Sequence, residues 1–246
     1  MPKSLSGRIA LVTGASRGIG RATAIALARE GAHVVALART VGGLEELDDE
    51  IKKQGSGATL VPLDLRDFDA LDRLGASLYE RFQKLDVLVG NAGQLGTLSP
   101  LSHLDPKTWD EVFAVNVTAN WRLIRSLDPL LRAADAGRAV FITSGITYRV
   151  RAYWGLYAAS KAALEMLARV YAEETAKTKV RVNLFNPGPI RTRMRAKAMP
   201  GEDPMTLDTP EQAAEAILPL CLPSCEASGR IYSYPEKKFL AFNAPA

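Results

Sequence analysis

The sequence predicts one α/β domain over residues 1–246, in which a doubly wound sheet of about seven parallel strands is flanked by helices on both faces. Short apolar, β-branched runs alternate with longer stretches of helical periodicity, a pattern typical of parallel strands joined by crossover helices. No Gly/Pro/Ser-rich linker, internal repeat or compositional break divides the chain, which favours a single domain.

The expected strands are near-continuous hydrophobic runs, as in strands covered on both faces. These runs are Arg8–Thr13, His33–Ala38, Thr59–Leu63, Val87–Val89, Ala139–Thr143, Val180–Leu184 and Ile231–Ser233. The expected helices are Ile19–Glu30, Gly43–Gln54, Phe68–Phe82, Pro106–Ala134, Leu156–Lys177 and Pro210–Leu222. The longest remaining stretch, Pro187–Thr209, is predicted to be a loop with a short helix, and loops of that length are usually functional or disordered.

Composition and charge exclude several classes of function. The net charge is +4, but Lys and Arg are scattered without a dense basic run, so no nucleic-acid partner is expected. Cys221 and Cys225 lack a second Cys pair or a nearby His, so no metal site is expected, and two thiols suit a reducing compartment. The first apolar stretch, Ile9–Val12, is too short for a membrane span or a signal-peptide core. We therefore expect a cytoplasmic protein without a membrane partner.

A glycine-rich turn follows the first expected strand. Gly14, Gly18 and Gly20 have the spacing G-x3-G-x-G, which differs from G-x-G-x-x-G but meets the same physical demands. The turn is tight, its backbone can approach a pyrophosphate, and a helix N-terminus is exposed to the anion. One glycine could serve the turn alone, whereas three at this spacing indicate a phosphate site.

Tyr157 and Lys161 are four residues apart, which places both side chains on one face of a helix. A phenol normally keeps its proton to pH ~10, and a cation within hydrogen-bonding range lowers that pKa by roughly one to three units. The pair therefore predicts a tyrosine that exchanges a proton near neutral pH. Singly, each residue would suit packing with a solvated polar head.

Several further motifs occur in a fixed order along the chain: Asp64-Leu65, Asn91-Ala92-Gly93, Asn116, Ser144 and Asn186-Pro187-Gly188. With the glycine turn and the Tyr157/Lys161 pair, they make the chain resemble the short-chain dehydrogenase/reductase family, in its shorter subclass, from Gly7 to about Gly229. The resemblance implies a Rossmann-like fold and hydride transfer between a nicotinamide cofactor and a carbonyl or secondary alcohol substrate.

The resemblance also implies four catalytic residues. Tyr157 would be the general acid and base, and Ser144 would hold the substrate carbonyl oxygen. Lys161 would hold the nicotinamide ribose and lower the pKa of the tyrosine. Asn116 would distort its helix and position water linking Lys161 to solvent.

The end of the second expected strand predicts NADP(H) as the cofactor. An acidic residue there would bind the ribose hydroxyls of NAD, but the chain has Ala38, Arg39 and Thr40, and Arg17 can reach the same region. Two guanidiniums that no carboxylate opposes favour a 2′-phosphate. By resemblance, Asp64 would accept a hydrogen bond from the adenine amino group. The expected cofactor-binding residues are Gly14, Ser16, Arg17, Gly18, Ile19, Gly20, Arg39, Thr40, Asp64, Leu65, Asn91, Ala92, Gly93, Tyr157, Lys161, Pro187, Gly188, Ile190 and Thr192.

The substrate stays open at this level. A carbonyl reductase is the leading interpretation; a 3-oxoacyl-carrier-protein reductase and a non-catalytic NADP(H) sensor are alternatives, and the intact Tyr157/Lys161 pair argues against the sensor. Residues 187–209 are expected to form a lid whose Arg191, Arg193, Arg195 and Lys197 could attract an anionic substrate. The expected pocket-lining residues are Gln94, Leu95, Tyr148, Arg151, Tyr153, Trp154, Met194 and Met199. By resemblance, pairing through the two long helices, Pro106–Ala134 and Leu156–Lys177, would give a homodimer, with a homotetramer left open.

Overall fold

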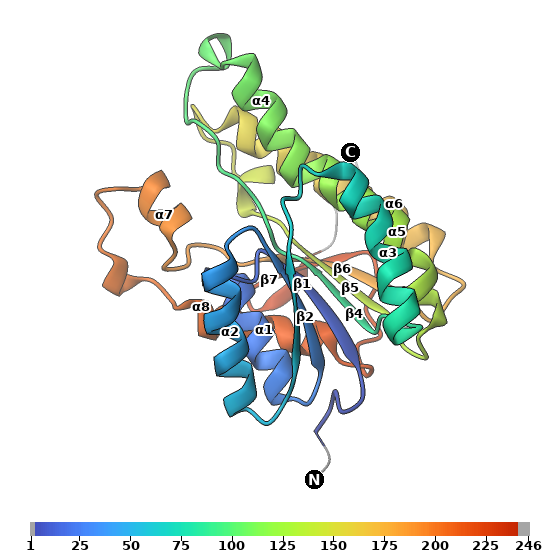
Figure 1. Ribbon diagram of the computed structural model, residues 1–246. Helices are drawn as coiled ribbons and strands as arrows, with labels where there is room; N and C mark the ends of the chain where they lie inside the picture. The colour runs from blue at the N-terminus through green and yellow to red at the C-terminus, as the bar shows by residue number, and fades with distance from the viewer. Residues whose placement is uncertain (1–2, 241–246) are drawn as a thin grey trace.

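The computed structural model describes residues 3–240, so the ends of the predicted 1–246 domain lie outside it. One eight-stranded sheet has the order β3-β2-β1-β4-β5-β6-β7-β8 (Figure 1). Its seven parallel strands are β1 Ile9–Thr13, β2 His33–Ala38, β3 Ala58–Pro62, β4 Val87–Gly90, β5 Arg138–Ile142, β6 Arg181–Asn186 and β7 Arg230–Ser233. The predicted doubly wound parallel sheet is confirmed.

The eighth strand was not expected. β8, Lys238–Leu240, pairs antiparallel with β7 through a turn at residues 234–237, in which Lys237 has a φ of 53°. Three residues are too few to give a periodic pattern in the sequence, so the pairing depends on the neighbouring β7 edge.

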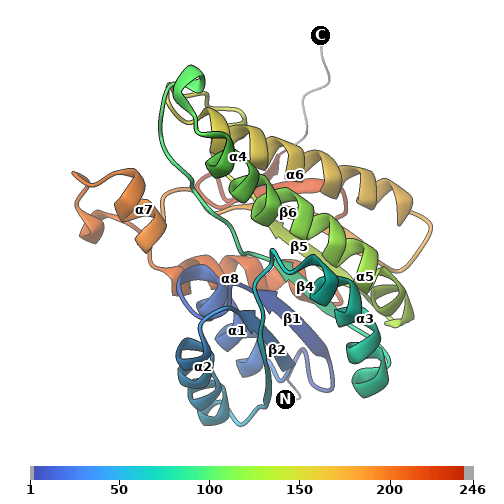
Figure 2. The same ribbon diagram turned by 45° about the horizontal axis from the view of Figure 1, so that its top comes forward.

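Helices cover both faces of the sheet (Figures 1 and 2). The helices of one face are α1 Gly18–Arg29, α2 Val41–Lys53 and α8 Pro210–Cys221. Those of the other face are α3 Phe68–Phe82, α5 Ala119–Ala133 and α6 Gly155–Glu174. Alternate residues of one strand enter the two cores, Val34 on the α1 side and Val35 on the α3 side. This two-sided burial explains why the strands read as continuous apolar runs.

The predicted single helix at residues 106–134 is interrupted. It consists of α4 Pro106–Phe113, a π-turn at Ala114–Thr118, and α5. The backbone carbonyl of Asn116 accepts a hydrogen bond of 2.9 Å from Asn120 Nδ2. The wider turn takes this carbonyl out of the regular ladder, and the Asn120 side chain satisfies it. A local distortion at Asn116 had been expected; sequence periodicity alone does not reveal its type.

The segment over residues 187–209 is a loop with short helical pieces, as predicted. It contains α7, Arg193–Ala198, and a 3-10 turn at Pro204–Thr206. Its two ends meet in a parallel bridge between Ile190 and Asp208. Figure 2 shows this segment as an arm, called the α7 arm below, beside the C-terminal ends of the parallel strands. Within residues 3–240, no helix has the length and apolarity to cross a bilayer.

Candidate active site

The glycine turn is built by close backbone approach. Gly14 and Gly18 have φ values of 65° and 57°, in the left-handed region that favours glycine. A Cβ on Gly14 would lie 2.9 Å from Asn91 Nδ2, and one on Gly20 would overlap the Gly14 carbonyl. A Cβ on Gly18 would meet only Thr192 Cγ2 within 4 Å, at 3.6 Å. The first turn of α1 has no side-chain cap, so its N–H groups remain for an anion. The turn therefore fits a pyrophosphate.

Thr13 joins the exits of β1 and β4. Its Oγ1 accepts hydrogen bonds of 3.0 Å from the backbone N–H groups of Asn91 and Ala92. Asn91 Nδ2 donates in return to the Thr13 carbonyl at 2.9 Å. These bonds fix the segment after β4 against the glycine turn, where the predicted cofactor residues Asn91 and Ala92 lie.

Asn116 ties the same segment to α6. Its Oδ1 accepts from Gln94 N at 2.8 Å, and its Nδ2 donates to the Gln94 carbonyl and to Ser160 Oγ, both at 2.9 Å. Ser160 Oγ donates to the Tyr157 carbonyl at 2.8 Å. The Asn116 and Ser160 side chains are fully buried, so water cannot satisfy their polar atoms and these hydrogen bonds do so instead. Asn116 is thus linked to the Tyr157 backbone through Ser160.

Tyr157 and Lys161 meet Ser144 at the end of β5. Tyr157 is 8% exposed and forms a hydrogen bond with the Ser144 side chain. Lys161 Nζ lies 5.8 Å from the centroid of the Tyr157 ring and donates to the Ile142 carbonyl at 2.7 Å. A Cβ on Gly93 would lie 3.5 Å from that Nζ, an ordinary contact distance, so Gly93 lies next to the lysine head. The structure thus brings the predicted catalytic side chains together.

Burial dominates the titration of this pair. It raises the pKa of Tyr157 to about 12, while the hydrogen bond with Ser144 lowers it. It lowers the pKa of Lys161 to about 8, against a raising contribution from the Glu165 charge. The expectation that Lys161 brings the tyrosine pKa toward neutrality is wrong for this arrangement. The ammonium donates to a backbone carbonyl, and loss of hydration outweighs its influence on the phenol.

Glu165 lies one helical turn beyond Lys161 and holds the strand end that carries Ser144. Its Oε1 accepts from Thr143 Oγ1 at 2.5 Å and from Thr147 Oγ1 at 2.9 Å. Burial raises the pKa of Glu165, and the two threonine hydrogen bonds lower it. The carboxylate therefore fixes both sides of Ser144.

Asn186 supports Ser144 from the neighbouring strand. Its Oδ1 accepts from the N–H groups of Gly145 and Gly188, at 3.0 and 3.1 Å. Its Nδ2 donates to Tyr148 Oη at 2.6 Å. The Tyr148 hydroxyl is therefore engaged with Asn186, which leaves Tyr157 as the phenol bonded to Ser144.

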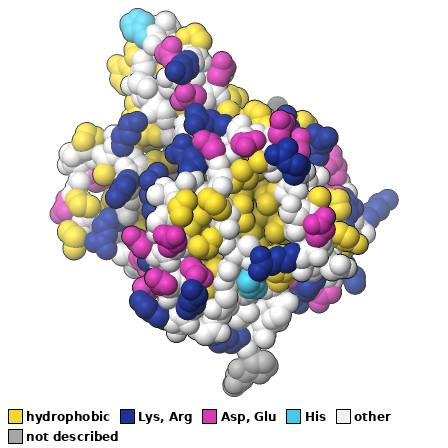
Figure 3. All heavy atoms as spheres, viewed as in Figure 1, with side chains coloured by type: hydrophobic (Ala, Val, Ile, Leu, Met, Phe, Trp, Pro, Cys, Tyr) yellow, Lys and Arg dark blue, Asp and Glu magenta, His cyan; other side chains and the backbone are white. Residues whose placement is uncertain are grey.

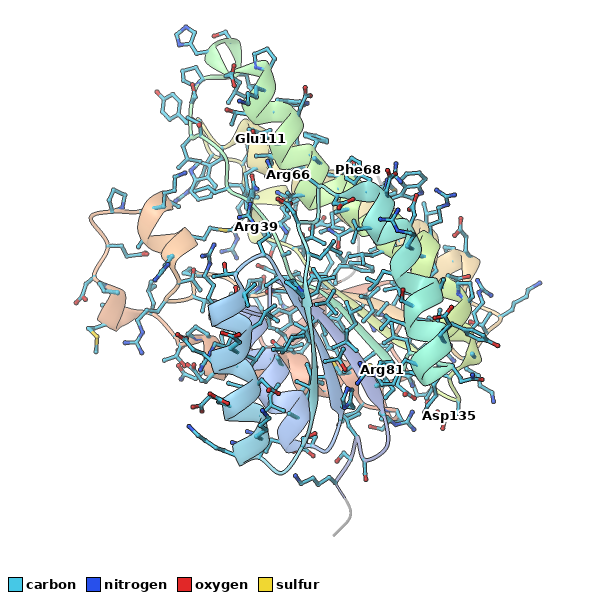
Figure 4. The ribbon with its side chains drawn as sticks, viewed as in Figure 1. Arg39, Arg66, Phe68, Arg81, Glu111 and Asp135 are labelled. Carbon is cyan, nitrogen blue, oxygen red and sulfur yellow. The ribbon has the colours of Figure 1, made fainter. Side chains whose placement is uncertain are left out.

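The positions expected to choose the cofactor lie near the start of α2. Arg39 is about half exposed, and its Nη1 is 3.8 Å from Asp64 Oδ2. Arg66 donates to the same carboxylate oxygen at 2.8 Å, and its hydrogen bond lowers the pKa of Asp64. The expectation that no carboxylate opposes Arg39 is therefore wrong, because the chain brings Asp64 beside it. Figure 4 shows Arg39 and Arg66 close together, and Figure 3 shows Lys and Arg side chains gathered between the start of α2 and the α7 arm.

Other predicted cofactor residues lie around this cradle. The Thr40 side chain makes no capping bond to α2, and a Cβ on Gly43 would lie 3.0 Å from Ser16 Cβ, so α2 begins against the glycine turn. Ile190 and Leu65 are buried. The Leu65 side chain enters the α3-side core, which leaves only its backbone for a ligand.

The α7 arm lies against the tyrosine. Leu95, Ile146 and Tyr157 form a buried apolar cluster, against which Trp154 and Met194 pack. This places three of the predicted lining residues beside Tyr157. Two others, Arg151 and Tyr153, are exposed, and Tyr153 has an unusual φ of 73°. The cluster connects the arm to the strand ends.

The site has a held interior and an exposed margin. We call the interior the floor; it comprises Thr13, Asn91, Asn116, Ser144, Tyr157, Ser160 and Lys161. We call the margin the rim; it comprises Arg17, Arg39, Thr40, Arg66, Arg195 and Glu202. Residues 3–240 contain no group of three or more His, Cys, Asp or Glu that could hold a metal, and Cys221 and Cys225 are free thiols.

The family model for short chain dehydrogenases matches residues 8–203. The chain belongs to the short-chain dehydrogenase family. The uncharacterized oxidoreductase YciK of Escherichia coli K12 is 42% identical over 221 residues, which are 89% of this chain and 86% of YciK. A short-chain dehydrogenase structure from Escherichia coli CFT073, complexed with NADPH, superposes with a TM-score of 0.90 at 39% identity, covering 95% of this chain and 98% of that one. A Mycobacterium tuberculosis H37Rv relative, 37% identical over 78% of this chain and 74% of its own, is named an uncharacterized NAD-dependent oxidoreductase.

Sequence reasoning missed several residues that organise this short-chain dehydrogenase site. Thr13, Ser160 and Glu165 hold the floor, and Arg66 and Glu202 set the charge of the rim. One signal was available, since Glu165 follows Lys161 at the i, i+4 spacing of an ion pair. Thr13 and Ser160 are small polar residues whose partners are distant in sequence, and Arg66 and Glu202 lie near their partners without a spacing that marks the pair.

Proposed function

We propose that this short-chain dehydrogenase reduces a carbonyl compound with NADPH, or oxidises the corresponding alcohol with NADP, with Tyr157 as general acid and base. The observation that carries the proposal is the buried Tyr157 side chain, bonded to Ser144 and one helical turn from Lys161. When bound, the cofactor supplies or accepts the hydride. The chain's own residues orient the substrate oxygen and move its proton.

Each catalytic side chain has a distinct part in this proposal. Ser144 Oγ holds the substrate oxygen beside the phenol, and Tyr157 gives that oxygen its proton. With a pKa of about 12, the phenol is protonated at neutral pH and ready to act as an acid. Lys161 would hold the ribose of the bound cofactor. Asn116 is a positioning residue, because it acts through Ser160 and the backbone of Tyr157. A protonated phenol favours reduction over oxidation.

NADP(H) is the proposed cofactor. Arg39 and Arg66 flank the carboxylate of Asp64, Arg66 also lies 4.0 Å from Glu111, and Arg17 adds a further guanidinium from the glycine turn. With Ala38 in place of an acidic residue and Thr40 free at the start of α2, the region suits a 2′-phosphate. The NADPH complex of the Escherichia coli relative supports this choice. The Mycobacterium tuberculosis relative, in contrast, is named as NAD-dependent.

Residues 187–209 are proposed to act as the lid and this chain to form a homo-oligomer. Met194 and Ala198 of the arm pack against the Tyr157 cluster, and Thr192 lies next to Gly18 of the phosphate turn. The arm therefore reaches both parts of the site. Trp121 on α5 and Met166 and Val170 on α6 are exposed large apolar side chains, which suits association through these helices.

A cofactor-consumption assay tests the proposal. The purified protein is given NADPH or NADH with a panel of uncharged ketones and aldehydes and an acetoacetyl thioester. We expect turnover with kcat/KM for NADPH at least about tenfold above that for NADH, the effect of one charge-assisted hydrogen bond. A preference for NADH would refute the cofactor assignment. Tight NADPH binding without turnover of any carbonyl or alcohol would favour a sensor, and a preference for the thioester would favour an oxoacyl reductase.

A further inference from the structure

The space around Tyr157 is apolar on three sides. Leu95 comes from the segment after β4, Ile146 from the turn after Ser144, and Met194 from α7. Trp154 presents its ring to Tyr157 at a centroid distance of 6.2 Å and an interplanar angle of 67°. A group next to the substrate carbonyl would therefore meet hydrocarbon and aromatic surface from the floor and from the lid. Such surroundings disfavour a charged group that has no partner.

One lid cation that neighbours this apolar surface in the sequence is already paired. Arg195 follows Met194 directly, and its Nε and Nη2 donate to the two carboxylate oxygens of Glu202, both at 2.5 Å. The two side chains are 21% and 26% exposed. The hydrogen bond with Arg195 lowers the pKa of Glu202, and the charge of Arg151, from the loop before α6, lowers it further. Glu202 is therefore ionised at neutral pH and within the influence of both arginines.

The other lid cations do not restore an anion site beside Tyr157. Lys197 Nζ approaches the Gly96 carbonyl at 3.5 Å, which links α7 to the segment after β4. Arg191 is in contact with the sulfur of Met205, and Arg193 is exposed. The four basic residues that had suggested attraction of an anionic substrate thus have different surroundings, and Arg195, one of the two arginines that flank Met194, is paired with Glu202.

We infer that the site takes an uncharged carbonyl compound with an apolar body, and that Glu202 enforces this choice by occupying Arg195. The inference rests on the proposed function and names its substrate class. An anionic substrate would have to displace Glu202 from a bidentate pair and would be repelled by the released carboxylate. It would also lose its hydration without gaining a partner. Glu202 is thereby a specificity-determining residue that need not touch the substrate.

A matched pair of compounds tests this inference. Ethyl benzoylformate and benzoylformate share an aromatic keto body; the acid carries one negative charge where the ester carries an ethyl group, so the change in their ratio between variants carries the test. For the wild-type protein with NADPH, we expect kcat/KM for the ester at least about tenfold above that for the acid, because one unpaired charge costs on this order. Glu202→Gln frees Arg195, so kcat/KM for the acid should rise about three- to tenfold relative to that for the ester at low salt.

Two further variants show whether the effect comes from the freed arginine. Arg195→Gln removes the arginine of the pair with Glu202 and should lower kcat/KM for the acid relative to that for the ester. Glu226→Gln removes a similar surface carboxylate, which is 3.9 Å from Arg181, and should leave the ratio of the two compounds unchanged. A wild-type preference for the acid would overturn the inference. An unchanged ratio of kcat/KM for the two compounds in Glu202→Gln would also overturn it.

Binding separates this inference from the proposed function. Calorimetry on the NADPH complex of Tyr157→Phe measures the affinity for each compound without requiring turnover. Tighter binding of the ester than of the acid, with the difference reduced by Glu202→Gln, would support the inference even if the wild-type protein reduced neither compound. Equal affinities, or tighter binding of the acid, would overturn it even if the wild-type protein proved to be a reductase.

Discussion

The floor and the rim of the site are held in different ways. On the floor, the fully buried Asn116 side chain makes three hydrogen bonds that join the segment after β4 to α6. On the rim, Arg39 is about half exposed beside Asp64, and Arg195 meets Glu202 in a pair that water reaches. Buried hydrogen bonds are costly to break, whereas exposed ion pairs contribute little to stability and are screened by salt. The floor therefore suits the common chemistry, and the rim suits the choice of cofactor and substrate.

The largest effect should follow from removing the proton donor of the floor. Tyr157→Phe should reduce turnover by roughly 10²–10⁴-fold, because it removes the proton transfer and little else. The dissociation constant for NADPH, measured by calorimetry, should change less than about threefold. Tyr79→Phe, an exposed tyrosine on α3, is the matched control. Near-normal rates in Tyr157→Phe would show that another group moves the proton.

Asn116→Ala should reveal how firmly the floor is built. It leaves the backbone N–H and carbonyl of Gln94 without their side-chain partner, so we expect a loss of about 2–4 kcal/mol in the free energy of unfolding. For a chain of this size this corresponds to a fall in Tm of roughly 5–15 °C. Calorimetric unfolding measures it. A Tm within about 2 °C of wild type would mean that the π-turn does not depend on this side chain.

The pH profile should report Lys161. Burial lowers its pKa to about 8, so the ammonium predominates below that pH and is lost above it. Because kcat/KM reports groups of the free enzyme, reduction should weaken about tenfold for each pH unit above 8. Tyr157, with a pKa of about 12, stays protonated across this range. In the pH profile of kcat the midpoint should lie at higher pH, because a bound anionic cofactor stabilises the Lys161 ammonium. A flat kcat/KM to pH 10 would exclude Lys161 as the titrating group.

On the rim, Arg39→Ala should change the choice of cofactor without disturbing the chemistry. The KM for NADPH should rise about tenfold or somewhat less, because the guanidinium is half exposed and Asp64 shares its charge. The KM for NADH should stay within about twofold of its wild-type value. Arg29→Ala removes an arginine paired with Glu215, far from the site, and serves as the control. An equal rise for both cofactors would place Arg39 outside any phosphate site.

The smallest effect should come from the lid pair. Arg195→Ala should shift Tm by no more than about 2 °C, because surface ion pairs contribute little to stability. The Tm shifts of Arg195→Ala and Asn116→Ala, measured in the same unfolding experiment, compare the contributions of a rim and a floor residue to stability. A fall in Tm as large as that of Asn116→Ala would mean that the lid is part of the core structure and not a margin attached to it.

Much of the site could be predicted because its chemistry is encoded by local spacing. Gly14, Gly18 and Gly20 follow β1, and Tyr157 and Lys161 share one face of α6, so short-range geometry already groups them. The seven parallel strands were predicted for the same reason, since each is an apolar run bounded by turn residues. Glu165 and Ser160 were missed because Thr143 and Asn116, their partners, lie 22 and 44 residues away. The antiparallel β8 and the π-turn likewise depend on contacts that no local pattern records.

The amino-acid order alone determined the family, the doubly wound sheet and the set of side chains available for proton and hydride chemistry. Tertiary structure decided the environment of those side chains. Burial raises the pKa of Tyr157 and lowers that of Lys161. The fold also places Asp64 beside Arg39 and pairs Arg195 with Glu202. The physical reason is range. Helical and strand spacing act over a few residues, whereas loss of hydration and charge pairing depend on whatever the fold brings within a few ångströms.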